Sequence, residues 1–103
     1  MFRVIYEWSV PEHNFDHFKP VWESTTDNIH HTVDGALGSF MLRSSNNPQQ
    51  ILTIAKWRDE TARQAFFDDA NPNAMLQMRQ LAERISVNAF HEVEDRTKPT
   101  AKL

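Results

Sequence analysis

The amino-acid sequence predicts an α+β fold in which four strands form one antiparallel sheet and helices cover one of its faces. Three observations carry this prediction. Residues 2–10 alternate between apolar and polar positions, as a half-buried strand does. Residues 15–33 carry apolar side chains at helical spacing. Residues 51–57, ILTIAKW, are apolar on both faces until Lys56, so this strand needs cover on each side.

The first strand and the helix after it have well-marked ends. The strand over 2–10 places its large apolar side chains on one face, and Pro11 ends it. Asn14 is a suitable N-cap for the helix, whose apolar row runs to about Val33. Gly35 then ends the helix, because glycine readily takes the left-handed conformation that follows a helix C-terminus.

The middle of the chain predicts a hairpin. Residues 36–44 have the pattern of a second strand, and residues 45–50, SNNPQQ, form a polar turn. The third strand is the apolar stretch 51–57. We expect the two strands to pair as an antiparallel hairpin with a longish loop.

A broken helix and a last strand complete the pattern. Asp59 can cap a short helix that carries Phe66 on its apolar face. The Asn-Pro-Asn stretch at 71–73 starts a second helical piece, because proline suits the first helical position. Residues 86–94 then have the composition of a strand.

This order of elements gives two βαβ-like halves, the split arrangement of ferredoxin-like folds. We expect residues 1–94 to form one domain and residues 95–103 to form a polar C-terminal tail. With both helices on one face of the sheet, no helix remains to cover the second face of 51–57. Exposed apolar patches above roughly a few hundred Å² are uncommon on monomers. We therefore expect a homodimer in which two sheets pack face to face.

The composition argues against several classes of function. The 103-residue chain has 11 Lys and Arg, 14 Asp and Glu and a net charge of −3, so we expect no nucleic-acid partner. It has no Cys for a thiolate metal site or nucleophile, and 2 Gly are too few for a nucleotide-binding loop. No apolar stretch reaches the ~20 residues of a membrane span. We expect a cytoplasmic protein that uses no metal and no organic cofactor.

Three stretches resemble the antibiotic biosynthesis monooxygenase (ABM) domain family: EWSV at 7–10, DGALGSFMLR at 34–43 and IAKWRDETARQAFF at 54–67. The resemblance spans roughly residues 2–93. It implies ferredoxin-like subunits that pair into a homodimeric α+β barrel, each with a pocket between sheet and helices. Family members known as enzymes oxygenate electron-rich aromatics, such as anthrones and quinols, without metal or flavin. A separate branch binds and degrades haem.

The resemblance does not extend to the residues of the haem-degrading branch. That branch has an Asn where this sequence has Trp8 and a Trp where it has Phe66. It also has an axial His near the position of Leu76, whereas no histidine lies between His31 and His91 here. We therefore do not expect haem degradation.

His30 is the candidate catalytic base, because histidine is the usual proton-transfer residue in enzymes. At about 100° per residue from Trp22, the centre of the buried helix face, His30 falls about 80° away, at the pocket edge. His31 falls about 180° away and should be exposed to solvent. A helix C-terminus also stabilises a charged histidine, so a purely electrostatic role for His30 stays open. His13 and His17 lack the Glu of a zinc motif and are expected to be solvated.

We expect an aromatic pocket, although core packing is the structural alternative for each candidate residue. The candidate pocket residues are Tyr6, Trp8, Trp22, Trp57, Phe66 and Met75. Tyr6 and His91 are further candidate proton acceptors, and His91 could lie in either the pocket or a dimer interface. The sequence thus predicts a cofactor-independent monooxygenase that acts on dioxygen and a small electron-rich aromatic or quinol. The alternative is a non-catalytic, small-molecule-binding dimer of the same fold.

Overall fold

A computed structural model describes residues 1–68 and 76–100 of the chain. The predicted order of elements is confirmed, with one added 3₁₀ turn. The elements are β1 (Phe2–Ser9), η1 (Glu12–Asn14), α1 (Phe15–Thr32), β2 (Ala36–Arg43), β3 (Gln50–Trp57), α2 (Glu60–Asp68), α3 (Leu76–Leu81) and β4 (Glu83–His91).

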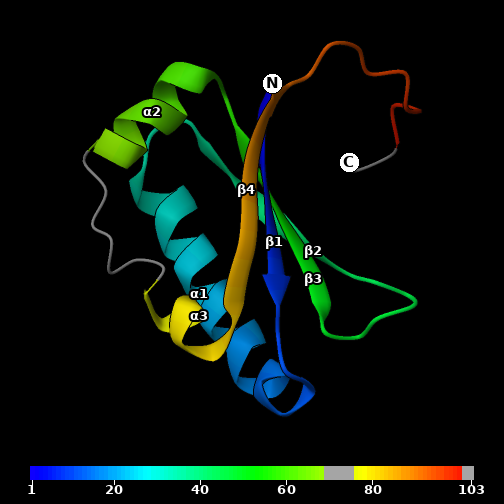
Figure 1. Cartoon of the computed structure of the whole chain (residues 1–103). Coiled ribbons are helices and arrows are strands. Elements are labelled where there is room, and N and C mark those ends of the chain that lie inside the picture. Colours follow the sequence, from blue (N-terminus) through cyan, green and yellow to red (C-terminus); the bar gives the residue numbers. More distant parts are fainter. Residues whose placement is uncertain (69–75, 101–103) are drawn as a thin grey trace.

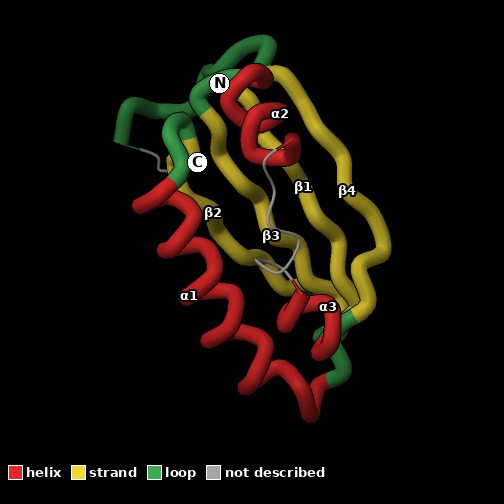
Figure 2. Tube along the Cα trace, turned by 90° about the vertical axis from the view of Figure 1, so that its left-hand side faces the viewer, coloured by secondary structure: helices red, strands yellow, loops and turns green. Residues whose placement is uncertain are grey.

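The molecule has two layers, a sheet and a set of helices on one of its faces (Figure 1). The strands pair antiparallel in the order β2-β3-β1-β4, as a ferredoxin-like fold requires. Figure 2 shows α1 running along the β2 side of the sheet, with α2 and α3 over the other strands. The α+β fold class predicted from the sequence is therefore confirmed.

The register of β1 sets which side chains meet beneath the helices. Tyr6 lies opposite Thr53 of β3 on one side and Val87 of β4 on the other. Along β1, buried residues alternate with half-buried ones, as the alternating sequence predicts. A bulge between Glu7 and Trp8 shifts the pairing with β4 but not the pairing with β3.

Several predicted element ends are confirmed, and others need correction. Asp59 caps α2, since its Oδ1 accepts a hydrogen bond of 2.8 Å from the Ala62 backbone N–H. Gly35 has φ +84°, the left-handed conformation expected after α1. Asn14 stands at the N-cap of α1 but makes no side-chain cap hydrogen bond there. Its Nδ2 instead donates to the Leu81 carbonyl at 3.0 Å.

The last strand was predicted over 86–94, but β4 begins at Glu83 and ends at His91. It begins earlier because pairing with β1 continues to Ser9, which lies opposite Glu83. Because residues 83 and 84 are both charged, the hydrophobicity pattern does not indicate a strand at this point. The predicted helix start at 71–73 lies outside the described residues.

The core lies between the helices and the inner face of the sheet. Its largest fully buried side chains are Val4, Trp8, Val10, Phe18, Ile51 and Met78. The rings of Trp8 and Phe18 meet edge to face with centroids 5.4 Å apart, a favourable aromatic geometry. Burial of these side chains fixes α1 and α3 against the sheet.

The outer face of the sheet carries apolar side chains and no helix among the described elements (Figure 1). In register across the three strands β2, β3 and β1 stand Phe40, Ile54 and Ile5, all half-buried. Leu42 and Phe90 on the same face are 47% and 52% exposed. This face is the feature on which the expected homodimer depends.

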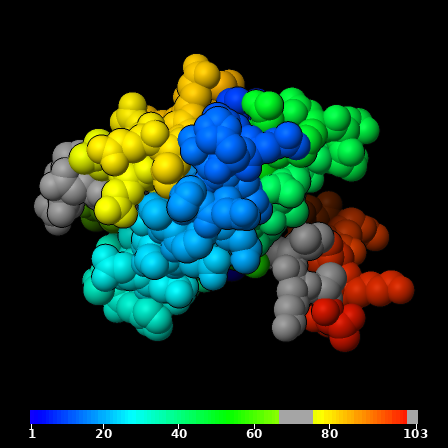
Figure 3. Space-filling model, turned by 90° about the horizontal axis from the view of Figure 1, so that it is seen from below, coloured from blue at the N-terminus to red at the C-terminus, as the bar shows by residue number. Residues whose placement is uncertain are grey.

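After β4, Glu92 is still tied to the N-terminal end of the chain, since its N–H donates to the Met1 carbonyl at 2.9 Å and its carboxylate lies 3.0 Å from the Arg3 guanidinium. The rest of the C-terminal segment extends away from the helices (Figures 1 and 3). The described residues of this segment, 92–100, are exposed and have no regular secondary structure. Among the described parts of the chain, none of the helices has both the length and the apolar character needed to span a membrane.

Candidate functional site

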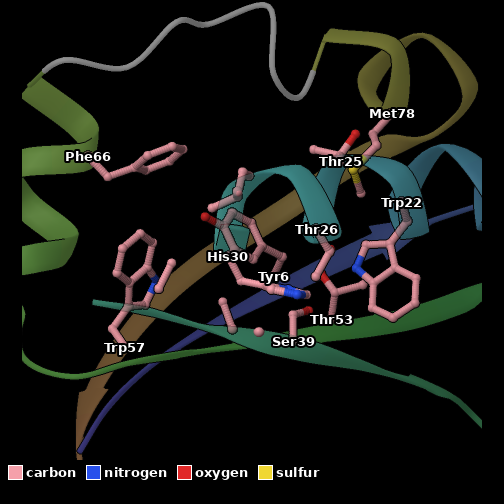
Figure 4. Close-up of a pocket in the computed structure, with 14 residues that line it drawn as sticks. Tyr6, Trp22, Thr25, Thr26, His30, Ser39, Thr53, Trp57, Phe66 and Met78 are labelled. Carbon is pink, nitrogen blue, oxygen red and sulfur yellow. The ribbon is translucent and has the colours of Figure 1, made fainter. Parts of the chain in front are cut away.

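A cavity lies between α1 and the inner face of the sheet (Figure 4). Its volume is about 60 Å³, whereas one water molecule needs roughly 10–15 Å³, so the cavity has room for more than one water molecule. Three strands and three helices contribute the lining, which consists of Tyr6, Trp22, Thr25, Thr26, Ile29, His30, Ala36, Gly38, Ser39, Thr53, Ala55, Trp57, Phe66 and Met78.

A second hollow, of about 310 Å³, adjoins the cavity between α1 and β2. Both spaces share the wall residues Trp22, Thr26, His30, Gly38 and Ser39. The second hollow is also bounded by the exposed carboxylates of Glu23 and Asp27. It provides a polar approach from the surface to the more apolar cavity.

The structure brings five of the seven predicted site residues to the cavity: Tyr6, Trp22, His30, Trp57 and Phe66. Trp8 lies elsewhere, in the core, with 0% of its surface exposed. Trp8 therefore takes the core position that the sequence left as the alternative, and it is not part of the cavity lining. Met75 lies outside the described residues, and Met78 of α3 supplies a thioether to the cavity.

His30, in the last turn of α1, presents a buried nitrogen to this region. Its Nδ1 is shielded from solvent and has no hydrogen-bond partner. Gly38 lies next to this nitrogen, since a Cβ at that position would be in ordinary van der Waals contact with Nδ1, at 3.8 Å. Buried polar atoms are nearly always hydrogen-bonded, so an unpaired one at a cavity wall is suited to a ligand.

His31 differs from its neighbour in being exposed, as the helical spacing predicts. The two imidazole rings lie 4.4 Å apart between centroids. His91 is not part of the cavity, because it lies at the end of β4 beside α2. Its Nε2 is 2.8 Å from a carboxylate oxygen of Glu60, and its side chain is 71% exposed.

Tyr6 places a phenol on the sheet side of the cavity with only 7% of its surface exposed. Burial raises the pKa of this phenol above its usual value of 10.0, although the nearby guanidinium groups of Arg63 and Arg84 act in the opposite direction. Arg63 also hydrogen-bonds the phenol. The Tyr6 hydroxyl is consequently neutral near pH 7 and can act as a hydrogen-bond donor.

Aromatic rings form the two ends of the cavity, as Figure 4 shows. Trp57 and Phe66 lie together at one end with ring centroids 5.5 Å apart. Trp22 of α1 lies at the other end. Flat apolar walls of this kind suit an aromatic ligand.

Sequence reasoning missed the hydroxyl-bearing part of the lining, which consists of Thr25, Thr26, Ser39 and Thr53. Thr53 is the clearest case, because it lies on the inner face opposite Tyr6. The alternation within ILTIAKW places Thr53 on one face with Trp57, but it does not give the pairing with β1. Among the described residues, no cluster of three His, Cys, Asp or Glu could hold a metal ion.

The fold and the cavity together place the chain among small α+β proteins with a cavity between a sheet and its helices. The sequence model of one such family, antibiotic biosynthesis monooxygenase, matches residues 1–75. The chain belongs to this family, and the resemblance found in the sequence is confirmed. A search of curated proteins finds no match.

Solved structures support the same fold. A variant of SnoaB, a cofactor-independent oxygenase from Streptomyces nogalater, aligns with a TM-score of 0.78 at 17% identity, over 94% of this chain and 97% of SnoaB. A candidate antibiotic biosynthesis monooxygenase from Deinococcus radiodurans aligns with a TM-score of 0.76 at 16% identity, covering 95% and 98% of the two chains. Rv0793 from Mycobacterium tuberculosis aligns at 0.71 and 12% identity, covering 93% and 98%.

Proposed function

We propose that the protein is a cofactor-independent monooxygenase that oxygenates a small electron-rich aromatic or quinol in the cavity beneath α1. The observation that carries this proposal is the buried, unpaired Nδ1 of His30 at the wall of an aromatic cavity. Family membership and the fold shared with SnoaB, itself described as a cofactor-independent oxygenase, support it.

The proposed reaction begins with a proton transfer. Dioxygen is a triplet and reacts slowly with closed-shell organic molecules, so the substrate must first become a better electron donor. His30 Nδ1 removes a proton from a phenol, a quinol or the acidic carbon of an anthrone, and the resulting anion passes one electron to dioxygen.

The remaining steps balance without an added reductant. The substrate radical and superoxide combine, so that a new carbon–oxygen bond forms. The oxygen–oxygen bond then breaks, one oxygen atom stays on the carbon, and the other leaves as water with two hydrogens from the substrate. The substrate supplies all four electrons, and an anthrone, for example, becomes an anthraquinone.

We also propose that the working form is a homodimer joined through the outer sheet faces. The apolar row across Phe40, Ile54 and Ile5 supports this, because a second sheet would cover it. A cytoplasmic location stays a prediction from the sequence.

The alternative function is a dimeric module that binds a small molecule without changing it. One observation favours this alternative. Among the described residues, the cavity lining includes no carboxylate or lysine, so catalysis would depend on a single imidazole.

Oxygen uptake distinguishes the two functions. With anthrone or 1,4-naphthohydroquinone as substrate, uptake should depend on the protein and persist in the presence of a metal chelator. His30→Ala should slow it about 10²-fold or more, the usual effect of losing a general base. The matched variant His31→Ala, at an exposed position, should keep the wild-type rate. Equal rates for both variants would remove His30 from the mechanism, and no uptake with either compound would favour the binding module.

A further inference from the structure

Among the residues that the structure describes, Thr53 is the only buried one outside the apolar and aromatic types. It lies in the middle of β3 with 3% of its surface exposed, and it lines the cavity. A buried hydroxyl in a strand costs stability unless its hydrogen-bonding capacity is used. The partners of this hydroxyl therefore indicate what it does.

One partner of Thr53 is inside the protein. Trp8 Nε1 donates a hydrogen bond of 3.0 Å to Thr53 Oγ1, and this pair is buried. Because an indole nitrogen can only donate, the threonine oxygen is the acceptor. The indole occupies a lone pair on Oγ1 and leaves the hydroxyl proton available for a second hydrogen bond.

Among the described residues, none accepts a hydrogen bond from Thr53 Oγ1, and the space beside Thr53 is the cavity. Tyr6, the direct cross-strand partner of Thr53, brings a second hydroxyl to the same side of the cavity. His30, by contrast, comes from α1 on the opposite side (Figure 4). The sheet side can thus donate hydrogen bonds, while the helix side offers an unpaired imidazole nitrogen.

We infer that Thr53 is a ligand-binding residue, held in its donating orientation by Trp8, and that the ligand is an aromatic compound with an oxygen acceptor directed at β3. A carbonyl or a phenolate oxygen meets this requirement. Trp8 is then a positioning residue, which explains why a core tryptophan has its nitrogen directed at the cavity wall. In the proposed reaction, the Thr53 hydroxyl would hold the oxygen on which negative charge develops.

The inference depends on the cavity being the ligand site, as proposed above, but not on the oxygen chemistry. A binding experiment can therefore test it separately. The probes are 1-tetralone and tetralin, which share one carbon skeleton and differ by the carbonyl oxygen. Isothermal titration calorimetry of the full chain gives both dissociation constants, and their ratio measures what the protein gains from the carbonyl.

Thr53→Val, which replaces the hydroxyl by a methyl group of similar size, should weaken tetralone binding about 5- to 10-fold and leave tetralin binding nearly unchanged. Thr53→Ser should restore the wild-type ratio. The control Thr61→Val, at an exposed position on α2, should have no effect on either probe. If Thr53→Val leaves the ratio at its wild-type value, or if wild-type protein does not bind tetralone, the inference is wrong.

Trp8→Phe tests the positioning role. It removes the indole N–H, frees the Thr53 hydroxyl to rotate and should shift the ratio part of the way towards that of Thr53→Val. A wild-type ratio in this variant would overturn the role of Trp8 while leaving that of Thr53. The double variant Trp8→Phe/Thr53→Val leaves neither partner unpaired, so its melting temperature should fall by less than the sum of the two single effects.

Discussion

The imidazole of His30 lies over Gly38, a residue without a side chain in the edge strand β2. Gly38 has φ +102°, and a Cβ there would lie 3.8 Å from His30 Nδ1, an ordinary contact distance. Gly35, at the end of α1, has φ +84°, and a Cβ there would lie only 2.5 Å from the Cβ of Ala62. Both glycines satisfy a backbone requirement, but only Gly35 is also closely packed.

Alanine at these two glycines should therefore have unequal effects on stability. Gly38→Ala should lower the free energy of unfolding by roughly 1–2 kcal/mol through backbone strain alone. Gly35→Ala should cost more, about 3 kcal/mol, because overpacking against Ala62 adds to the strain. Urea denaturation at one protein concentration measures both values. Adding Ala62→Gly should recover part of the loss at Gly35 and none at Gly38, and equal losses for the two single variants would contradict the packing described.

Tyr6 should keep its proton well into the alkaline range. It is the only tyrosine of the chain, so the ultraviolet absorbance of tyrosinate reports this residue alone. Because burial raises the pKa of Tyr6 above 10.0, the folded protein holds the proton more tightly than the unfolded chain. The resulting stability is complete below pH 10.0 and is lost as the pH rises through the folded-state pKa.

A pH titration followed by absorbance and circular dichroism tests this prediction. Tyrosinate should appear above pH 10.0, together with loss of structure. Tyr6→Phe should unfold less steeply in the same alkaline range, since it has no phenol to ionise. Ionisation of Tyr6 in the folded wild-type protein below pH 10.0 would contradict the prediction, because the two arginines would then lower the pKa more than burial raises it.

The cap of α2 should weaken in acid. The backbone N–H of Ala62, followed by Arg58, lowers the pKa of the Asp59 carboxyl below its usual 3.8. The carboxylate thus stabilises the fold above pH 3.8, and this contribution is lost as the pH falls through the folded-state pKa. Asp59→Ala should lower the melting temperature at pH 7, Asp59→Asn should lower it less, and the differences should shrink in strong acid. A difference that persists unchanged in acid would contradict the role of the charge.

The outer sheet face should hold two subunits together. Light scattering at micromolar concentration should give twice the 12.0 kDa chain mass. Ile54→Asp should produce monomers or unfolded protein, because it places an unpaired charge in the middle of the apolar row. The control Thr61→Asp, on the helix side of the molecule, should stay dimeric. A wild-type protein that remains monomeric at that concentration would exclude this assembly.

Much of the fold follows from the sequence because it depends on local patterns. Alternation in residues 2–10 and helical spacing in residues 15–33 determine which faces are buried, and those faces determine the layers. The start of β4 could not be read in this way, since Arg84 lies on the inner strand face opposite Trp8 despite its charge. Strand pairing, rather than hydrophobicity, sets that boundary.

The site is harder to predict from the sequence, because it depends on how deeply each side chain is buried and on which residues pair across the strands. Helical spacing from Trp22 placed His30 at the pocket edge, and the structure places it in the lining. Alternation placed Trp8 and Tyr6 on one face, but it could not show that Phe18 covers Trp8 while Tyr6 reaches the cavity. The hydroxyl of Thr53 was missed because only the pairing of β1 with β3 brings it beside Tyr6.

The central claim is that this cavity oxygenates an electron-rich ring with dioxygen alone. The most direct measurement is mass spectrometry of the product formed from anthrone under ¹⁸O-labelled dioxygen, with chelator present and no cofactor added. We expect one labelled oxygen atom per molecule of anthraquinone, formed at a rate that His30→Ala lowers about 10²-fold and His31→Ala leaves unchanged. Product without label, or labelled product formed equally fast by the His30 variant, would contradict it.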